Sequence, residues 1–188
     1  MGTRGLVGFV IDGEVKAHYN HWDSYPSGKG LDVLAFARTM SGRSGDGTVQ
    51  QVRDLRKVSE DADPTDEDTA RYAEYADGDV NQGIGWYSLL RRCQGDLALV
   101  LESGIILNQP EFATDSLFCE WAYLINVDDW TLEVFEGFQS EPHDLGRFAG
   151  PVDNCYYPVK LVAVYDLNDL PTDEEFTSLE DTKESEPA

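Results

Sequence analysis

The fold of this chain is decided near its N-terminus by residues 6–21, which read LVGFVIDGEVKAHYNH. Two runs rich in β-branched and aromatic residues flank Asp12-Gly13, and an Asp-Gly pair tolerates the positive φ angles of a type I′ turn. The pattern therefore predicts a β-hairpin. With Asp12 and Gly13 as the two loop residues, Leu6 faces Tyr19 and Arg4 faces His21.

Further along the chain, hydrophobic spacing predicts helices first and strands afterwards. Helices are expected over residues 31–40, 49–58 and 65–76, and over 86–101 as one helix or two short ones broken at Gly95. Strands are expected over residues 117–127, 131–135 and 159–165. Two strands, several helices and three more strands indicate an α+β class. We expect a mainly antiparallel sheet from the two hairpins and the C-terminal strand, covered by the central helices.

The length of 188 residues predicts one α+β domain over residues 1–170, followed by an acidic tail over 171–188. The tail carries seven acidic residues against Lys183 and few large apolar groups, so we expect it to be disordered. The whole chain has 36 acidic and 14 basic residues, a net charge of −22. Direct nucleic-acid binding is not expected, because it requires a basic surface.

Several other classes of protein are also excluded by the sequence. No apolar run approaches the roughly 18–20 residues of a membrane span, and Met1 is not followed by the apolar stretch of a signal peptide. A soluble cytoplasmic protein is expected, in the host cytoplasm if a phage encodes it. Cys93, Cys119 and Cys155 are far apart and lack metal-ligand spacing, so we expect no disulfide framework, metal or cofactor.

The open end of the hairpin carries a resemblance to a known family. Gly2-Thr3-Arg4 and the stretch AHYNHWDSYPSGKG at residues 17–30 resemble an uncharacterised family of phage, bacterial and fungal proteins, which have a Gly-Thr-Arg start and a Trp-Asp-Gly-Tyr-Pro-Ser-Gly loop. The resemblance covers about the first 40 residues. Ser24 stands where the family has Gly, and His21 where it has Gln. The resemblance implies no known activity, and the change at His21 speaks against a catalytic imidazole there.

The same end of the hairpin is the candidate site. It brings together residues suited to binding a ligand, namely Arg4, Asn20, His21, Trp22, Asp23, Tyr25 and Ser27. Arginine offers a planar bidentate donor and Trp or Tyr a stacking face, so the set predicts a pocket for a small anionic or aromatic ligand. Alternatively, the same residues have only a structural role and bind no ligand. In that interpretation Asp23 pairs with Arg4, and Tyr25-Pro26 packs inside the loop.

Two further functions stay open. If processing exposes Thr3, its hydroxyl and α-amino group could serve as nucleophile and base of an N-terminal-nucleophile amide hydrolase or amidotransferase, with Arg4 holding a substrate carboxylate. Asn20 or Asp23 would then orient the base or stabilise an oxyanion. The acidic surface could instead cover a basic protein partner, as in a phage-encoded or accessory protein. We expect binding rather than catalysis.

Overall fold

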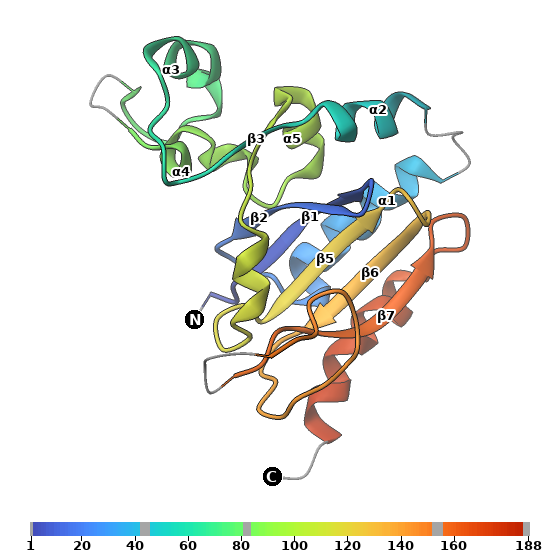
Figure 1. Ribbon diagram of the computed structural model, residues 1–188. Coiled ribbons are helices and arrows are strands. Elements are labelled where there is room, and N and C mark those ends of the chain that lie inside the picture. Colours follow the sequence, from blue (N-terminus) through green and yellow to red (C-terminus); the bar gives the residue numbers. More distant parts are fainter. Residues whose placement is uncertain (1, 42–45, 81–83, 152–155, 186–188) are drawn as a thin grey trace.

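The computed structural model describes residues 2–41, 46–80, 84–151 and 156–185. Its centre is a five-stranded sheet in the order β2-β1-β5-β6-β7 (Figure 1), whose strands are β1 Gly5–Ile11, β2 Glu14–Asn20, β5 Trp121–Asn126, β6 Thr131–Glu136 and β7 Lys160–Asp166. In this sheet β1 and β5 are parallel, and the other neighbouring strands are antiparallel. The predicted α+β class with a mainly antiparallel sheet is confirmed.

The N-terminal hairpin has the predicted register. Leu6 lies opposite Tyr19, and the ladder runs from Gly5 and Asn20 to the turn. Asp12 and Gly13 have φ angles of 52° and 74°, the left-handed conformation that a type I′ turn requires at both central positions. Arg4 and the loop after Asn20 therefore leave the ladder at the same end of the sheet.

The helices are short and lie mostly between β2 and β5 in the sequence. A π-helical turn at Pro26–Gly30 leads into α1, and the helices are α1 Leu31–Met40, α2 Asp46–Asp54, α3 Asp66–Tyr72, α4 Trp86–Leu89, α5 Leu97–Ser103 and α6 Asp173–Thr177. Among the described residues, 3₁₀ helices lie at Ala73–Tyr75, Arg91–Cys93, Pro110–Thr114 and Ser178–Ser185. Helix α1 has the predicted bounds, and α4 and α5 are separated at Gly95 as expected.

The predicted helix over residues 49–58 is wrong at its end. Helix α2 stops at Asp54, and residues Arg56–Val58 form β3, which pairs in parallel with β4 (Ile105–Leu107). The ammonium group of Lys16 donates hydrogen bonds to the carbonyls of Val52, Arg53 and Leu55, at 3.0, 2.8 and 3.3 Å. These bonds satisfy the terminal carbonyls that a continued helix would use.

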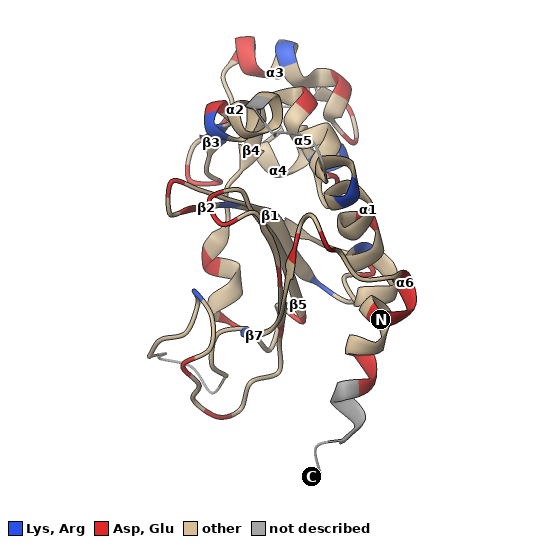
Figure 2. Cartoon of the chain, turned by 90° about the vertical axis from the view of Figure 1, so that its right-hand side faces the viewer, with Lys and Arg blue, Asp and Glu red and all other residues tan. Residues whose placement is uncertain are grey.

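The sheet is covered on both faces. Figure 2 views it from the side, with α1 and α6 along one face and loop segments along the other. Phe9, Tyr123 and Leu34 belong to the core on the helical face, whereas Leu124 and Phe135 pack on the loop side. Strand β5 is buried along its whole length, and it begins at Trp121 instead of residue 117 because Leu117 and Phe118 precede it in an exposed turn.

The acidic C-terminal segment, which the sequence predicts to be a disordered tail, forms helical turns where the structure describes it. Thr172 and Glu175 form a capping box that starts α6, and Phe176 is completely buried. Its ring lies 6.2 Å from that of Tyr123 and 5.9 Å from that of Tyr165. One buried phenyl ring, which contributes about 1.5–3 kcal/mol, anchors an otherwise acidic segment. Residues 186–188 lie outside the described chain, and one domain over 1–170 stays a prediction.

Candidate functional site

The loop after β2 is fixed by buried polar contacts. Ser24 is fully buried; its amide donates to the carbonyl of Thr3 at 3.1 Å, and its own carbonyl accepts the Tyr123 hydroxyl at 2.8 Å. The side-chain amide of Asn20, which is 5% exposed, donates to Ser24 Oγ at 2.7 Å and to the Trp22 carbonyl at 2.5 Å. The buried Asn20 side chain therefore fixes the position of the loop, and the Trp22 side chain is exposed to solvent.

The second half of the loop is bonded to itself and to the C-terminal segment. The Tyr25 hydroxyl donates to Asp23 Oδ1 at 3.0 Å, and this bond raises the pKa of Tyr25. The amide of Lys29 donates to the Asp23 carbonyl at 2.7 Å, while the amide of Ser27 donates to Glu180. The structure thus joins Tyr25 to Asp23 and joins Ser27 to the C-terminal segment.

The predicted Arg4–Asp23 ion pair is not formed. The guanidinium carbon of Arg4 instead lies 4.7 Å from the ring centroid of Phe118, in the turn before β5. The backbone of Arg4 is tied to the same turn, because its carbonyl accepts the Glu120 amide at 2.9 Å. Within the described part of the chain, no carboxylate forms an ion pair with Arg4. The Phe118 side chain is 42% exposed, so this cation and its ring face solvent together.

A row of aromatic side chains continues from Arg4 along the end of β2. The Tyr19 hydroxyl and His21 Nδ1 share a hydrogen bond of 2.6 Å, and the His21 ring meets the Trp22 indole edge-on at 4.3 Å. Tyr19 is supported from behind by Phe112, at 4.9 Å between ring centroids. The Trp22 indole is 55% exposed. Gly2 passes close to the indole, so a Cβ atom at Gly2 would clash with the Trp22 ring.

A second guanidinium lies near the same tyrosine. Arg91 stacks over Tyr87 at 5.3 Å, and the Tyr87 ring centroid is 6.4 Å from that of Tyr19. Burial raises the pKa of Tyr19, while the positive charges of Arg4 and Arg91 act in the opposite direction. Both cations therefore act on the Tyr19 hydroxyl. We call the surface formed by Arg4, Tyr19, His21, Trp22, Tyr87, Arg91 and Phe118 the Arg4 face.

Arg4 and Arg91 lie outside the ion pairs of the described residues, although the Arg4 amide donates to the Glu120 carboxylate at 3.4 Å. Ion pairs with carboxylates engage other cations of the described residues, namely Lys29, Arg38, Arg53, Arg56, Lys57 and Arg147. Arg91 donates to the side-chain amide oxygen of Gln94, which carries no charge. Arg4 and Arg91 form no ion pair with a carboxylate of the described residues. They can therefore bind an anion whose aromatic ring stacks on the exposed side chains nearby.

Three residues of the Arg4 face could not be predicted from the sequence, namely Phe118, Tyr87 and Arg91. Tyr87 and Arg91 lie within a predicted helix, and Phe118 lies at the start of a predicted strand, about 100 residues from Arg4. Phe118 reaches Arg4 because β1 pairs in parallel with β5, which brings the turn before β5 next to the N-terminus. Tyr87 and Arg91 join the site through the contact of Tyr87 with Tyr19.

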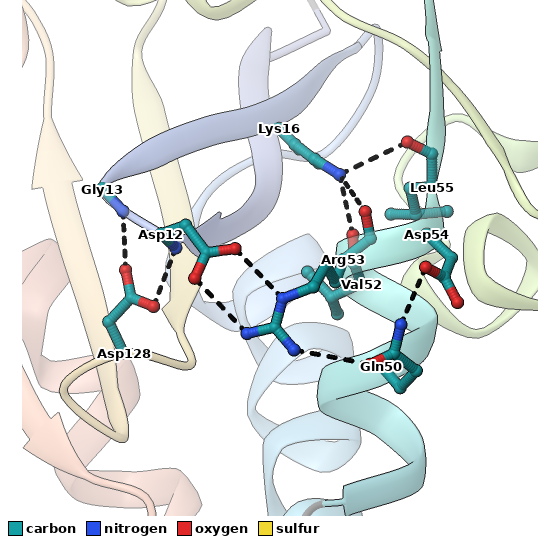
Figure 3. Close-up of polar contacts among 9 residues, drawn as sticks. All are labelled: Asp12, Gly13, Lys16, Gln50, Val52, Arg53, Asp54, Leu55 and Asp128. Atoms are coloured by element: carbon teal, nitrogen blue, oxygen red, sulfur yellow. Dashed lines mark hydrogen bonds and ion pairs between the residues drawn. The ribbon is translucent and has the colours of Figure 1, made fainter.

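The opposite end of the hairpin is a structural cluster (Figure 3). The carboxylate of Asp128 accepts the amides of Asp12 and Gly13, both at 2.8 Å, so the two hairpin turns are joined. Arg53 of α2 donates to the carboxylate of Asp12 at 3.1 Å, next to the contacts that Lys16 makes. These groups hydrogen-bond to one another, and the cluster therefore holds α2 against the sheet.

Neither metal nor thiol chemistry is indicated in the described residues. They contain no group of three or more His, Cys, Asp or Glu side chains that could hold a metal ion. Cys93 and Cys119 are buried free thiols, and burial raises the pKa of Cys93 to about 11. Cys155 lies outside the described residues. No helix in these ranges is both long and apolar enough to cross a membrane.

The fold and the site together define an α+β protein with a cationic and aromatic surface at the open end of its first hairpin. Comparison of the chain with protein-family models, with curated proteins and with solved structures found no match.

Proposed function

We propose that this protein binds a small anionic ligand that carries an aromatic ring, on the Arg4 face. The observation that supports this most is the Arg4 guanidinium, which lies over the Phe118 ring and forms no ion pair with a carboxylate of the described chain. The Trp22 indole, which contacts the His21 ring, is 55% exposed. A guanidinium offers paired N–H donors to a carboxylate or phosphate, and an indole offers a stacking surface. Arg91 adds a second positive charge that acts on Tyr19.

The net charge of −22 shapes this binding. It repels anions in general, so a small anion needs both the local cations and a stacking contribution, which is worth about 1–3 kcal/mol for a nucleobase. Binding should therefore require the anion and the ring in one molecule. It should also weaken when salt screens the two arginines.

The test uses AMP as an anionic aromatic probe and isothermal titration calorimetry of the full chain. Arg4→Gln should weaken AMP binding by about tenfold to a hundredfold, since hydrogen bonds to charged groups contribute about 1.5–3 kcal/mol. Arg71→Gln is the matched control, because Arg71 also lies over an aromatic ring, Tyr72, at 5.4 Å, but on α3. Equal affinity of wild type and Arg4→Gln, or no binding of AMP at all, would overturn the proposal.

The N-terminal-nucleophile alternative has less support from the geometry. The Thr3 carbonyl is bonded to Ser24, and in the described residues the Thr3 hydroxyl has no hydrogen bond to a base. Intact mass spectrometry of the protein from its native host tests this alternative directly. A mature chain that begins at Thr3 would favour the nucleophile, and one that begins at Met1 or Gly2 would remove it.

A further inference from the structure

His18 lies on the face of β2 opposite Tyr19 and is 3% exposed. Its Nε2 atom accepts the amide hydrogen of Gly95 at 2.6 Å. Burial lowers the pKa of His18 to about 4, and the charge of Lys29 acts in the same direction. The ring is therefore neutral at pH 7. A neutral imidazole carries one proton, and because Nε2 is the acceptor, that proton resides on Nδ1.

The Nδ1–H group needs an acceptor that the surrounding side chains do not provide. It is buried and has no hydrogen-bond partner in the part of the chain that the structure describes. A buried donor left unpaired costs about 1–3 kcal/mol, and such groups are rare in native proteins. An acceptor other than a described protein atom would remove this cost.

The ring borders a small cavity between β2, β4 and α5. Its volume is about 10 Å³, close to the minimum that one water molecule requires. Most of the wall is aliphatic, from Leu90, Val100, Ile105, Ile106 and Leu107, whereas the polar lining side chains are His18, Cys93, Gln94 and Gln109. The Oε1 atom of Gln109 already accepts the Tyr19 amide at 3.2 Å and has a second lone pair.

We propose that this cavity binds one structural water molecule, which accepts a hydrogen bond from His18 Nδ1–H and donates to polar atoms of the wall. The volume admits no larger molecule, and a neutral ring among aliphatic side chains offers no charge to hold an ion. His18 Nε2 connects β2 directly to the turn at Gly95, which follows the 3₁₀ helix that carries Arg91, and the water satisfies the other ring nitrogen. This inference is independent of the function proposed above.

The first experiment uses long-range ¹H–¹⁵N correlation spectra of the full chain labelled in histidine. We expect the proton of His18 on Nδ1, and a rotating-frame Overhauser contact between this proton and water. A proton on Nε2 would overturn the proposal. So would an Nδ1 proton that shows no contact with water.

A cavity-filling variant tests the bound water independently of the tautomer of His18. Val100→Ile adds one methylene to the wall, so it should abolish the water contact while the Gly95 amide keeps the proton on Nδ1. Val52→Ile, at a fully buried residue outside the cavity wall, is the matched control and should keep the water contact. A contact that persists in Val100→Ile would contradict this location of the water. If Val100→Ile does not fold, the wild-type spectrum alone decides the question.

Discussion

Lys16 and His18 are two ionisable side chains of β2 that lie inside the protein and are held by backbone atoms. Lys16 is 5% exposed and meets the terminal carbonyls of α2, whereas His18 accepts an amide hydrogen. Burial lowers the pKa of both groups. Each therefore links the first hairpin to a segment far along the chain, and each has a measurable consequence.

His18 makes stability depend on pH. Its pKa falls from 6.5 in the unfolded chain to about 4 in the folded one, so between these values the unfolded state binds more protons. Stability should be fully present above pH 6.5 and fall by about 3 kcal/mol as the pH drops to 4, at 1.36 kcal/mol per pKa unit. Urea unfolding from pH 4.5 to 7 measures this. His18→Leu should lack most of this slope and His143→Leu should keep it, whereas equal slopes in the two variants would contradict this role of His18.

Lys16→Met should destabilise the protein by about 2 kcal/mol, because the carbonyls of Val52 and Leu55 lose a buried charged donor. Lys57→Met is the control, since its ion pair with Glu14 is exposed and such pairs contribute about 0.2–1 kcal/mol. Chemical denaturation of both variants checks the prediction. A loss for Lys16→Met no larger than that for Lys57→Met would show that α2 does not depend on these bonds.

At the scale of elements, α6 is held mainly by one side chain. Phe176→Ala should destabilise the protein by about 3–5 kcal/mol, because it leaves a cavity between Tyr123 and Tyr165. Leu145→Ala, at a 47% exposed apolar residue, should change stability by less than about 0.5 kcal/mol. Thermal and urea unfolding compare the two. A small effect of Phe176→Ala would mean that the acidic C-terminal segment does not pack as described.

The elements also differ in how far they could be predicted from sequence. The first hairpin and α1 were predicted correctly because their turn residues and apolar spacing are local signals. The end of α2 was not, since it depends on Lys16, which lies far away in sequence. The C-terminal helix was missed because its acidic composition outweighed the single apolar anchor Phe176. On the Arg4 face, the hairpin residues were predicted, whereas Phe118 and Arg91 join them only through tertiary structure.

For anion binding by the whole molecule, the distribution of charge on the surface is more important than the net charge. Figure 2 shows acidic residues spread over the helical layer and the C-terminal segment. The Arg4 face combines two arginines without ion-paired carboxylates among the described residues with exposed rings. AMP binding should therefore weaken when NaCl rises from 50 to 500 mM, because the Debye length falls roughly threefold. Calorimetry at the two salt concentrations measures this, and an affinity that does not change with salt would argue against an arginine-bound anion.

The most direct test of the central claim is a ¹H–¹⁵N shift map of the full chain during titration with AMP. We predict saturable shifts that gather at Arg4, Trp22, Arg91 and Phe118, which are far apart in sequence and adjacent on one surface. Adenosine and inorganic phosphate, added separately, should shift these amides less. Shifts that gather elsewhere, for example in the groove between α1 and α5 lined by Phe36, or no saturable shifts at all, would contradict the claim.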